Sequence, residues 1–356
     1  MAETNGNFFE DFHPGLTLKH AIPRTVTEGD QSLYVALTGD RRPLHCASTF
    51  AQRLGLRRET VNDLLVFHMV FGKSVGDISL NAVANLGYAE LVFLKSVYPG
   101  DTLRAESKVL GVKENSSGKT GIVWVETTGL NQDGEAVLRY VRWVMVHKRD
   151  PSSPAPVASP PKTKAALTVD ELVIPAGFEA PVGELYETGG ARFFEDYEAG
   201  QELAHAGGMT IEDADHMSAT RLYQNTAKVH FDGHGMSESR FGRRLMYGGH
   251  VMSVCHALAF AGLENAVGIA GFNGGTHSAP TFGGDTLYAR TEILETAEAP
   301  GRSDVGFVRC RLNGYKNIDP ASPPPRRVMV GEKERWHENV VLDLDYWMTV
   351  LRRTEA

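Results

Sequence analysis

The sequence is poor in the features that mark several large classes of protein. It has 3 cysteines in 356 residues (Cys46, Cys255 and Cys310), too few and too scattered for a disulfide framework or a zinc site. No uninterrupted apolar run approaches the ~20 residues that a membrane-spanning helix needs, so we expect no membrane partner. The first 15 residues lack a basic segment followed by an apolar one, which predicts no signal peptide and a cytoplasmic protein.

Positive charge is also scarce. The chain has 36 Lys and Arg against 44 Asp and Glu, a formal net charge of −8, which argues against nucleic acid as a partner and favours small molecules. A phosphate loop and a dinucleotide fingerprint are both absent, so we expect no cofactor. What remains is an ordinary globular composition, with 42% hydrophobic and 22% charged residues, in a chain long enough for two domains.

The chain repeats itself. The segment 8–45 aligns without a gap with 193–230 at an offset of 185, and 12 of the 38 aligned pairs are identical. The Gly-Asp-Thr of 100–102 recurs at 284–286, and both halves end in a similar run of apolar and basic residues. An order kept over so many blocks indicates a tandem duplication.

A proline-rich stretch separates the two copies. Five prolines lie between Pro151 and Pro161, and proline withholds a backbone donor, which excludes a helix or a central strand there. We therefore predict a domain over 1–149, an extended linker over 150–190, whose apolar residues near 166–178 pack back on a domain, and a second domain over 191–356. A later proline-rich insertion, 319–327, is typical of a surface loop.

Each half shows the same pattern of elements. A helix is predicted near 27–37 and an apolar helix near 64–75, followed by alternating, β-rich runs at 85–97, 102–115, 121–131 and 136–148. One long helix followed by four antiparallel strands predicts an α+β fold with a sheet wrapped around a helix. Two such halves can join their sheets edge to edge and leave a shared cleft.

The segment 34–51, YVALTGDRRPLHCASTFA, places Asp40 and His45 five residues apart. A carboxylate and an imidazole can hold one water between them and move its protons near neutral pH. Gly39 permits a tight turn, and Pro43 stiffens the approach to the histidine. The spacing alone leaves two interpretations open: an acid/base pair, or a capped turn with a satisfied core histidine.

This segment resembles the signature of the R-specific enoyl-CoA hydratases, the hydratase 2 or MaoC-like dehydratase family, in its aromatic residue, Leu-Thr-Gly-Asp, Pro-Leu-His and final alanine. The resemblance implies a hot-dog fold in each half, hence a tandem hot dog. It also implies that Asp40 and His45 hydrate a trans-2-enoyl-CoA. The family usually has Asn where this chain has Arg42, a departure that bears on the hydrogen bonding of the loop.

Four longer blocks resemble the mesaconyl-CoA hydratases, also called 2-methylfumaryl-CoA hydratases or β-methylmalyl-CoA dehydratases. They are FHMVFGKSVGDISLNAVANLGYAE, YVRWVMVHKRDP, TRLYQNTAKVHF and RFGRRLMYGGHV. The resemblance implies a hydro-lyase of the ethylmalonyl-CoA pathway of acetate assimilation, which reversibly hydrates mesaconyl-C1-CoA to (2R,3S)-β-methylmalyl-CoA. CoA is then part of the substrate. Two alternatives stay open: an R-specific hydratase of other short or medium acyl-CoAs, and a non-catalytic acyl-CoA-binding protein.

The second copy of the motif differs at one position. His230 keeps the place of His45, but Asn225 stands where Asp40 stood, and an amide orients water without acting as a base. The complete chemistry of the first copy favours Asp40 and His45 as the working pair. Asn225 and His230 form a competing or auxiliary pair.

The resemblance also implies backbone donors for the thioester oxygen. In the family, the residue after a histidine at the start of the central helix offers its N–H. Matching His68 with His250 across the repeat assigns this role to Met69 and Val251. The two histidines themselves are expected to cap or pack the helix.

Cations near the second motif are candidates for binding CoA phosphates or a substrate carboxylate; the alternative is a solvated basic face. They are Lys228, Arg240, Arg243 and Arg244. His230 and His234 are four residues apart, but the glycines around His234 disfavour a helix and therefore a metal site. Exposed sheet edges predict a homo-oligomer.

Overall fold

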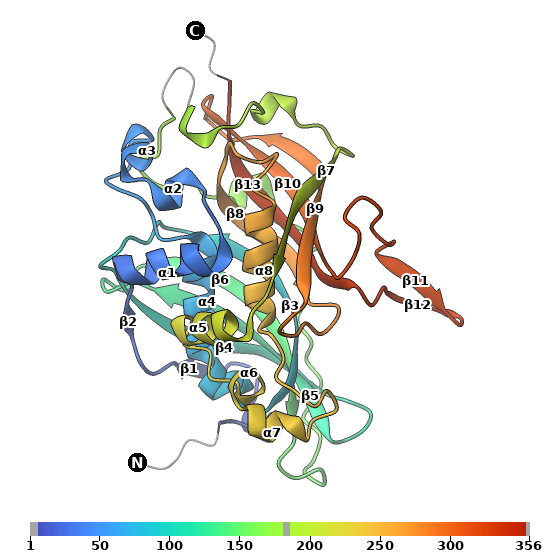
Figure 1. The fold of residues 1–356 in the computed structure, drawn as a ribbon. Helices are drawn as coiled ribbons and strands as arrows, with labels where there is room; N and C mark the ends of the chain where they lie inside the picture. Colours follow the sequence, from blue (N-terminus) through green and yellow to red (C-terminus); the bar gives the residue numbers. More distant parts are fainter. Residues whose placement is uncertain (1–5, 181–185, 354–356) are drawn as a thin grey trace.

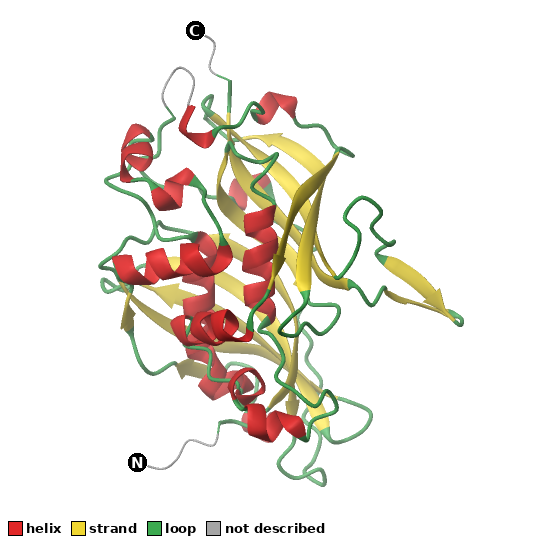
Figure 2. Ribbon diagram, in the orientation of Figure 1, coloured by secondary structure: helices red, strands yellow, loops and turns green. Residues whose placement is uncertain are grey.

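Two buried helices lie side by side against one large antiparallel sheet, as Figures 1 and 2 show. They are α4 (Asp63–Ser74), which belongs to the first half, and α8 (Gly248–Leu258), which belongs to the second. The computed structural model describes residues 6–180 and 186–353. No helix in these two ranges is long and apolar enough to cross a membrane.

The remaining elements of the first half are η1 (Phe9–Asp11), β1 (Thr17–Lys19), β2 (Arg24–Thr25), α1 (Glu28–Thr38), α2 (Pro43–Cys46), α3 (Ser48–Arg53), η2 (Val75–Ser79), β3 (Ala82–Phe93), β4 (Thr102–Glu114), β5 (Thr120–Leu130) and β6 (Ala136–His147). Later elements are η3 (Val169–Glu171), η4 (Tyr186–Thr188), η5 (Phe194–Asp196), β7 (Glu202–Thr210), α5 (Asp213–Leu222), α6 (Lys228–Phe231), α7 (Gly233–Ser237), β8 (Ala266–Thr276), β9 (Thr286–Glu298), β10 (Val305–Lys316), β11 (Arg327–Val330), β12 (Lys333–Trp336) and β13 (Val340–Leu351). The predicted helices and strands of the first half are confirmed to within a few residues.

The two halves share one sheet. Its strand order is β1-β4-β5-β6-β3-β8-β13-β10-β9-β7, with β2 also paired to β4. The halves meet where β3 pairs with β8, with Tyr88 opposite Gly275 and Val92 opposite Gly271. The expected α+β architecture and the edge-to-edge closure are therefore confirmed.

The offset of 185 seen in the sequence holds through the helices. It relates η1 to η5, α1 to α5, and the first residues of α4 and α8, Asp63 and Gly248. It places Ser253 opposite His68, so the sequence match between His68 and His250 is wrong. Between β10 and β13 the second half gains the hairpin β11–β12, which projects away from the body in Figure 1.

The apolar residues after the proline-rich stretch pack back on the sheet. Leu167, Leu172 and Phe178 are buried in one cluster with Val267 and Trp347. Because Val267 lies on β8 and Trp347 on β13, the segment that joins the two copies packs against strands of the second half and belongs to the common core. The proline-rich insertion at 319–326 is a loop, as expected.

Candidate active site

The first copy of the motif is shaped by a helix end and a proline. Helix α1 ends at Gly39, whose φ of 73° lies in the left-handed region where a side chain is disfavoured. Pro43 then stands at the first position of α2, where its missing N–H costs nothing. These two turns bury Asp40 and His45, which are 1% and 2% exposed.

The carboxylate of Asp40 has partners on both oxygens. Oδ1 accepts from the backbone N–H of Arg42 at 3.2 Å and from its guanidinium Nη1 at 3.1 Å. Oδ2 accepts from Nδ2 of Asn62 at 2.9 Å. The guanidinium is itself 1% exposed and also donates to the carbonyl of His256 on α8, which ties the motif to the other half.

This ion pair keeps Asp40 charged. Burial alone would raise the pKa of Asp40, but the charge of Arg42 and the hydrogen bond and charge of His256 hold it far below its usual range. A carboxylate with such a low pKa is a weak base, and its oxygens are already occupied by protein donors.

His45 is held in a similar way. Its Nδ1 lies 3.0 Å from Oγ1 of Thr60, and its Nε2 lies 3.7 Å from Oδ2 of Asp63. Burial acts to lower the pKa of His45, but the hydrogen bond and charge of Asp63 and the charge of Asp40 outweigh it and raise the pKa. Asp63 also accepts the N–H of Ile269 at 2.8 Å, so this carboxylate occupies the start of α4.

A small pocket lies beside the partners of His45, and neither Asp40 nor His45 lines it. The pocket lined by Thr60 and Asp63 encloses about 40 Å³. Since a buried water needs a cavity of roughly 10–15 Å³, such a pocket holds a few waters and no acyl group.

The second copy of the motif has different contacts. His230 donates from Nδ1 to the carbonyl of Leu245 at 2.9 Å, the counterpart of the Thr60 carbonyl that lies 3.3 Å from Nδ1 of His45. Its Nε2 has no hydrogen-bond partner among the described residues and is, in this tautomer, a free lone pair. Burial lowers the pKa of His230 to about 4, so the ring is neutral at pH 7.

Asn225 is positioned by the backbone around it. Its side-chain Oδ1 accepts the backbone N–H of Ala227 at 3.0 Å, and its backbone N–H donates to the carbonyl of Thr220 at 3.1 Å. The side-chain amide thus keeps its Nδ2 donors free of partners within the described part of the chain. Helix α4 supports this loop closely, because a Cβ on Gly72 would lie 2.0 Å from the carbonyl oxygen of Tyr223.

A large cavity opens in front of the second motif. It encloses about 820 Å³, within the range of ligand sites, and Asn225 and His230 both line it. No described Asp or Glu is among its lining residues. Two lining groups that the sequence did not indicate are Tyr88 of β3 and His277 after β8, whose Oη and Nε2 lie 3.1 Å apart. The cavity therefore uses residues of both halves.

The start of α8 supplies backbone donors to this cavity. Gly248 is the first residue of α8 and lines the cavity, and the N–H groups of Gly248 and Gly249 have no acceptor among the described residues. The roles expected of Val251 and Met69 are wrong. The N–H of Val251 donates to the Tyr247 carbonyl at 3.2 Å, and Met69 lies inside α4, where its N–H belongs to the helix.

The two histidines expected to pack the helices do so. His68 is fully buried, with Nε2 2.8 Å from Oγ of Ser253, and Nδ1 of His250 lies 3.3 Å from the hydroxyl of Tyr223. Burial lowers the pKa of His250 to about 4 and also holds that of His68 well below its usual value, so both rings are neutral at pH 7.

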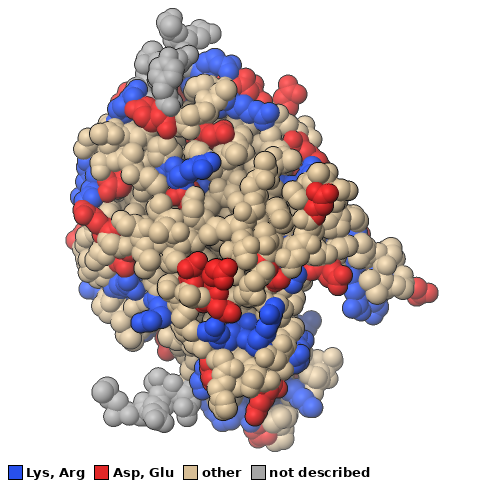
Figure 3. Space-filling model, in the orientation of Figure 1, with Lys and Arg blue, Asp and Glu red and all other residues tan. Residues whose placement is uncertain are grey.

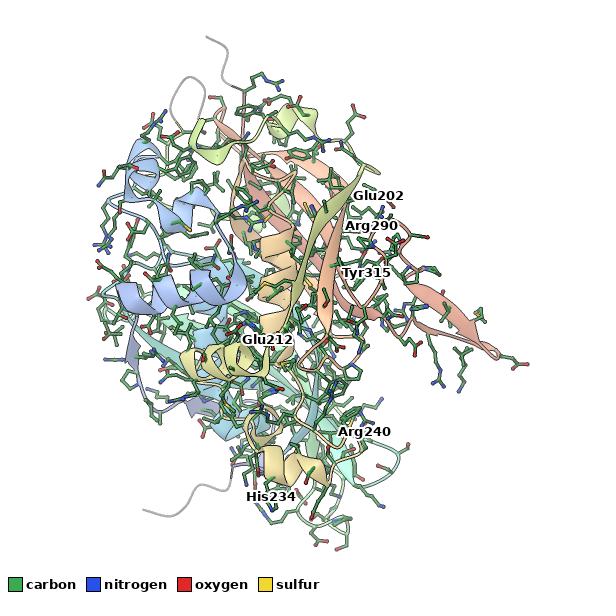
Figure 4. All side chains as sticks on the ribbon, in the orientation of Figure 1. Glu202, Glu212, His234, Arg240, Arg290 and Tyr315 are labelled. Carbon is green, nitrogen blue, oxygen red and sulfur yellow. The ribbon has the colours of Figure 1, made fainter. Side chains whose placement is uncertain are left out.

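Of the four candidate cations, Arg240 lines the cavity. Figure 4 shows it beside α7, at the same end of the molecule as His234, and Figure 3 shows Lys and Arg gathered in this region. Lys228 and Arg243 are exposed, and Arg244 pairs with Asp213 at 3.0 Å; these three are not among the cavity residues.

A short helix does form around His234, contrary to the expectation from its glycines. Gly233 begins α7, but α6 ends at Phe231, so His230 and His234 belong to two different helices. No group of three or more metal-ligating side chains occurs within residues 6–180 and 186–353.

Comparison with known proteins gives full-length relatives. A family model described as mesaconyl-CoA hydratase matches residues 1–322. The chain is 50% identical over 353 residues to a β-methylmalyl-CoA dehydratase of Chloroflexus aurantiacus, covering 99% of both sequences. It is 49% identical over 355 residues to a mesaconyl-CoA hydratase of Cereibacter sphaeroides, covering 99% of this chain and 100% of the relative.

Solved structures give the same result for the fold. A MaoC domain protein dehydratase from Chloroflexus aurantiacus superposes with a TM-score of 0.94 at 48% identity, covering 99% of both chains. A Mycobacterium tuberculosis protein described as a double hotdog superposes with a TM-score of 0.74 at 25% identity, covering 98% of this chain and 99% of the other. The predicted tandem hot-dog fold is confirmed.

Proposed function

Because this chain belongs to the mesaconyl-CoA hydratase family and is a hydro-lyase, we propose that it reversibly hydrates mesaconyl-C1-CoA to (2R,3S)-β-methylmalyl-CoA in the cavity of its second half. The observation that carries the location is the contrast between the two copies of the motif. Asp40 and His45 line neither cavity, the pocket beside them encloses about 40 Å³, and both oxygens of Asp40 are already hydrogen-bonded, whereas Asn225 and His230 line a cavity of about 820 Å³.

The reaction needs a base for water, and His230 supplies it. Its Nε2 takes a proton from a water that the amide of Asn225 orients, and the oxygen of that water bonds to Cβ of the enoyl group. The electron pair of the double bond moves onto the thioester, whose oxygen becomes enolate-like. The imidazolium then returns the proton to Cα, so that one water is added and no net proton is consumed.

The developing charge on the thioester oxygen is stabilised by the start of α8. The N–H groups of Gly248 and Gly249 and the positive end of the helix dipole act there without a side chain. Glycine is needed at position 248, since a Cβ would lie 2.7 Å from the ring of His277. At the cavity mouth, the exposed Arg240 binds a CoA phosphate.

The direct test is the enoyl-thioester absorbance during incubation with mesaconyl-CoA. We expect the band to decrease and the product to gain the mass of one water, with crotonyl-CoA hydrated more slowly. An unchanged band with mesaconyl-CoA, together with no band appearing from β-methylmalyl-CoA, would remove the proposal. Faster turnover of crotonyl-CoA would instead favour a general enoyl-CoA hydratase.

The acid side of the pH profile tests the base. A base works in its unprotonated form, so a pKa of about 4 predicts that kcat/KM stays level from pH 8 down to pH 5. An imidazole with the ordinary pKa of about 6.5 would instead lose roughly thirtyfold of its activity by pH 5. The measurement is kcat/KM in buffers of constant ionic strength, and a fall in kcat/KM centred near pH 6.5 would rule out the neutral, half-buried His230 as the base.

A further inference from the structure

A charged residue occupies a core position on β6. Along this strand Tyr140, Arg142 and Val144 share one face, because side chains alternate, and all three are buried. The side chain of Arg142 is 0% exposed, so its guanidinium is enclosed in the protein. A guanidinium stays protonated in proteins, and the site therefore holds a full positive charge.

No carboxylate in the described part of the chain balances this charge. Nη2 donates to Oγ of Ser74 at 2.9 Å, Nη1 lies 3.4 Å from Oγ of Ser79, and the guanidinium carbon lies 4.3 Å from the ring centroid of Phe71. Nε is buried without a partner, and the charged or titratable groups that act on the guanidinium are tyrosines, with no described carboxylate among them. The tyrosines that interact with it (Tyr88, Tyr140 and Tyr247) have pKa values raised by burial and stay neutral.

The guanidinium lies directly behind the wall of the large cavity. Ser79 and Phe71, which it contacts, are cavity-lining residues, and so is Tyr88, its neighbour across β3 and β6. Arg142 is thus separated from the cavity by a hydroxyl and an aromatic ring. Arg240, the one Lys or Arg among the described lining residues, is exposed.

An enclosed charge without a counter-ion is costly to a folded protein unless a ligand compensates it. The cavity beside it has no described acidic residue, a wall of aromatic rings, and the hydroxyl of Ser79 between the cavity and the cation. An anionic group bound there would accept from that hydroxyl, and the guanidinium directly behind it would stabilise the negative charge across this hydroxyl.

We propose that Arg142, together with Ser79, recognises the free carboxylate of the acyl group and makes the cavity specific for acyl-CoAs that end in a carboxylate. This inference rests on the proposed function, which places the acyl chain in this cavity. Arg142 and Ser79 determine specificity and take no part in proton transfer.

The test compares two saturated thioesters that cannot be hydrated, succinyl-CoA and butyryl-CoA. Both have four-carbon acyl groups, and only the first ends in a carboxylate. By calorimetry we expect wild-type protein to bind succinyl-CoA more tightly. Arg142→Met is expected to weaken succinyl-CoA binding by at least about thirtyfold, the loss typical of a buried charge pair, and to leave butyryl-CoA binding nearly unchanged.

The matched control is Arg240→Met, which is expected to weaken both thioesters by the same factor, because it acts on the common CoA part. If Arg142→Met keeps the wild-type ratio of the two affinities, the inference is overturned. Should that variant fail to fold by circular dichroism, Ser79→Ala replaces it, with a reduced ratio expected and an unchanged one overturning the inference.

The binding ratio also separates this inference from the proposed function. It is measured without turnover, so a wild-type protein that does not hydrate mesaconyl-CoA would remove the proposed reaction alone. Hydration of mesaconyl-CoA combined with an unchanged ratio in Arg142→Met would remove the carboxylate site alone.

Discussion

Replacing His230 with glutamine is expected to lower kcat for the hydration of mesaconyl-CoA by about 10²–10⁴-fold, the contribution typical of a general base. Glutamine has a similar size and can still donate toward the carbonyl of Leu245, but it has no basic nitrogen. His45→Gln, the matched substitution in the first copy, is expected to leave kcat near the wild-type value, because the pocket beside it is too small for the acyl group.

These two variants are compared by single-turnover kinetics on protein shown to be folded. Asp40→Asn adds a third comparison, since it makes the first copy resemble the second and is expected to keep turnover. If His45→Gln and Asp40→Asn lose activity while His230→Gln stays active, the catalytic site lies in the first half and the proposed location is wrong.

Removing the partner of Asp40 is expected to be among the most destabilising changes in the chain. Arg42→Met leaves a carboxylate that is 1% exposed without its cation, which typically costs about 3–5 kcal/mol in the free energy of unfolding. It also removes the hydrogen bonds to the carbonyl of His256, and thereby a link between the motif and α8.

Urea unfolding at pH 7 measures this loss, and a second variant identifies its cause. Adding Asp40→Asn to Arg42→Met removes the unpaired charge and is expected to recover part of the stability. The control is Arg244→Met, which breaks the more exposed pair with Asp213 and is expected to cost about 0–1 kcal/mol. Equal losses from Arg42→Met and Arg244→Met would show that the buried pair does not stabilise the fold.

Much of the fold could be predicted from the repeat. An offset of 185, read from segments as short as Phe-Phe-Glu-Asp, relates the first residues of α4 and α8 to each other. The match of His68 with His250 was wrong because it followed local sequence similarity and departed from this offset. Ser253 is the counterpart of His68, and the two side chains meet across the helices at 2.8 Å.

The site could be predicted less completely, for reasons that lie in three dimensions. Arg42 was recognised as a departure, but the turn that aims its guanidinium back at Asp40 is a property of the folded loop. Asp63 occupies the start of α4, whereas Gly248 leaves the start of α8 open. Each lies 18 residues after the histidine of its own motif, His45 or His230. Arg142 left a signal that could have been read, namely a charge on the core-facing side of an alternating strand.

The single sheet with its β3–β8 seam has a consequence for how the two copies could diverge. An assembly of two identical single-repeat chains carries equivalent pockets, so a substitution that closes one closes the other. Covalent fusion removes this symmetry. Arg42 and Asp63 can fill one pocket while their counterparts, Ala227 and Gly248, leave the other open. The first copy, with its small pocket, then keeps a structural role in the same chain, because Gly72 of α4 packs against the loop that carries the second motif.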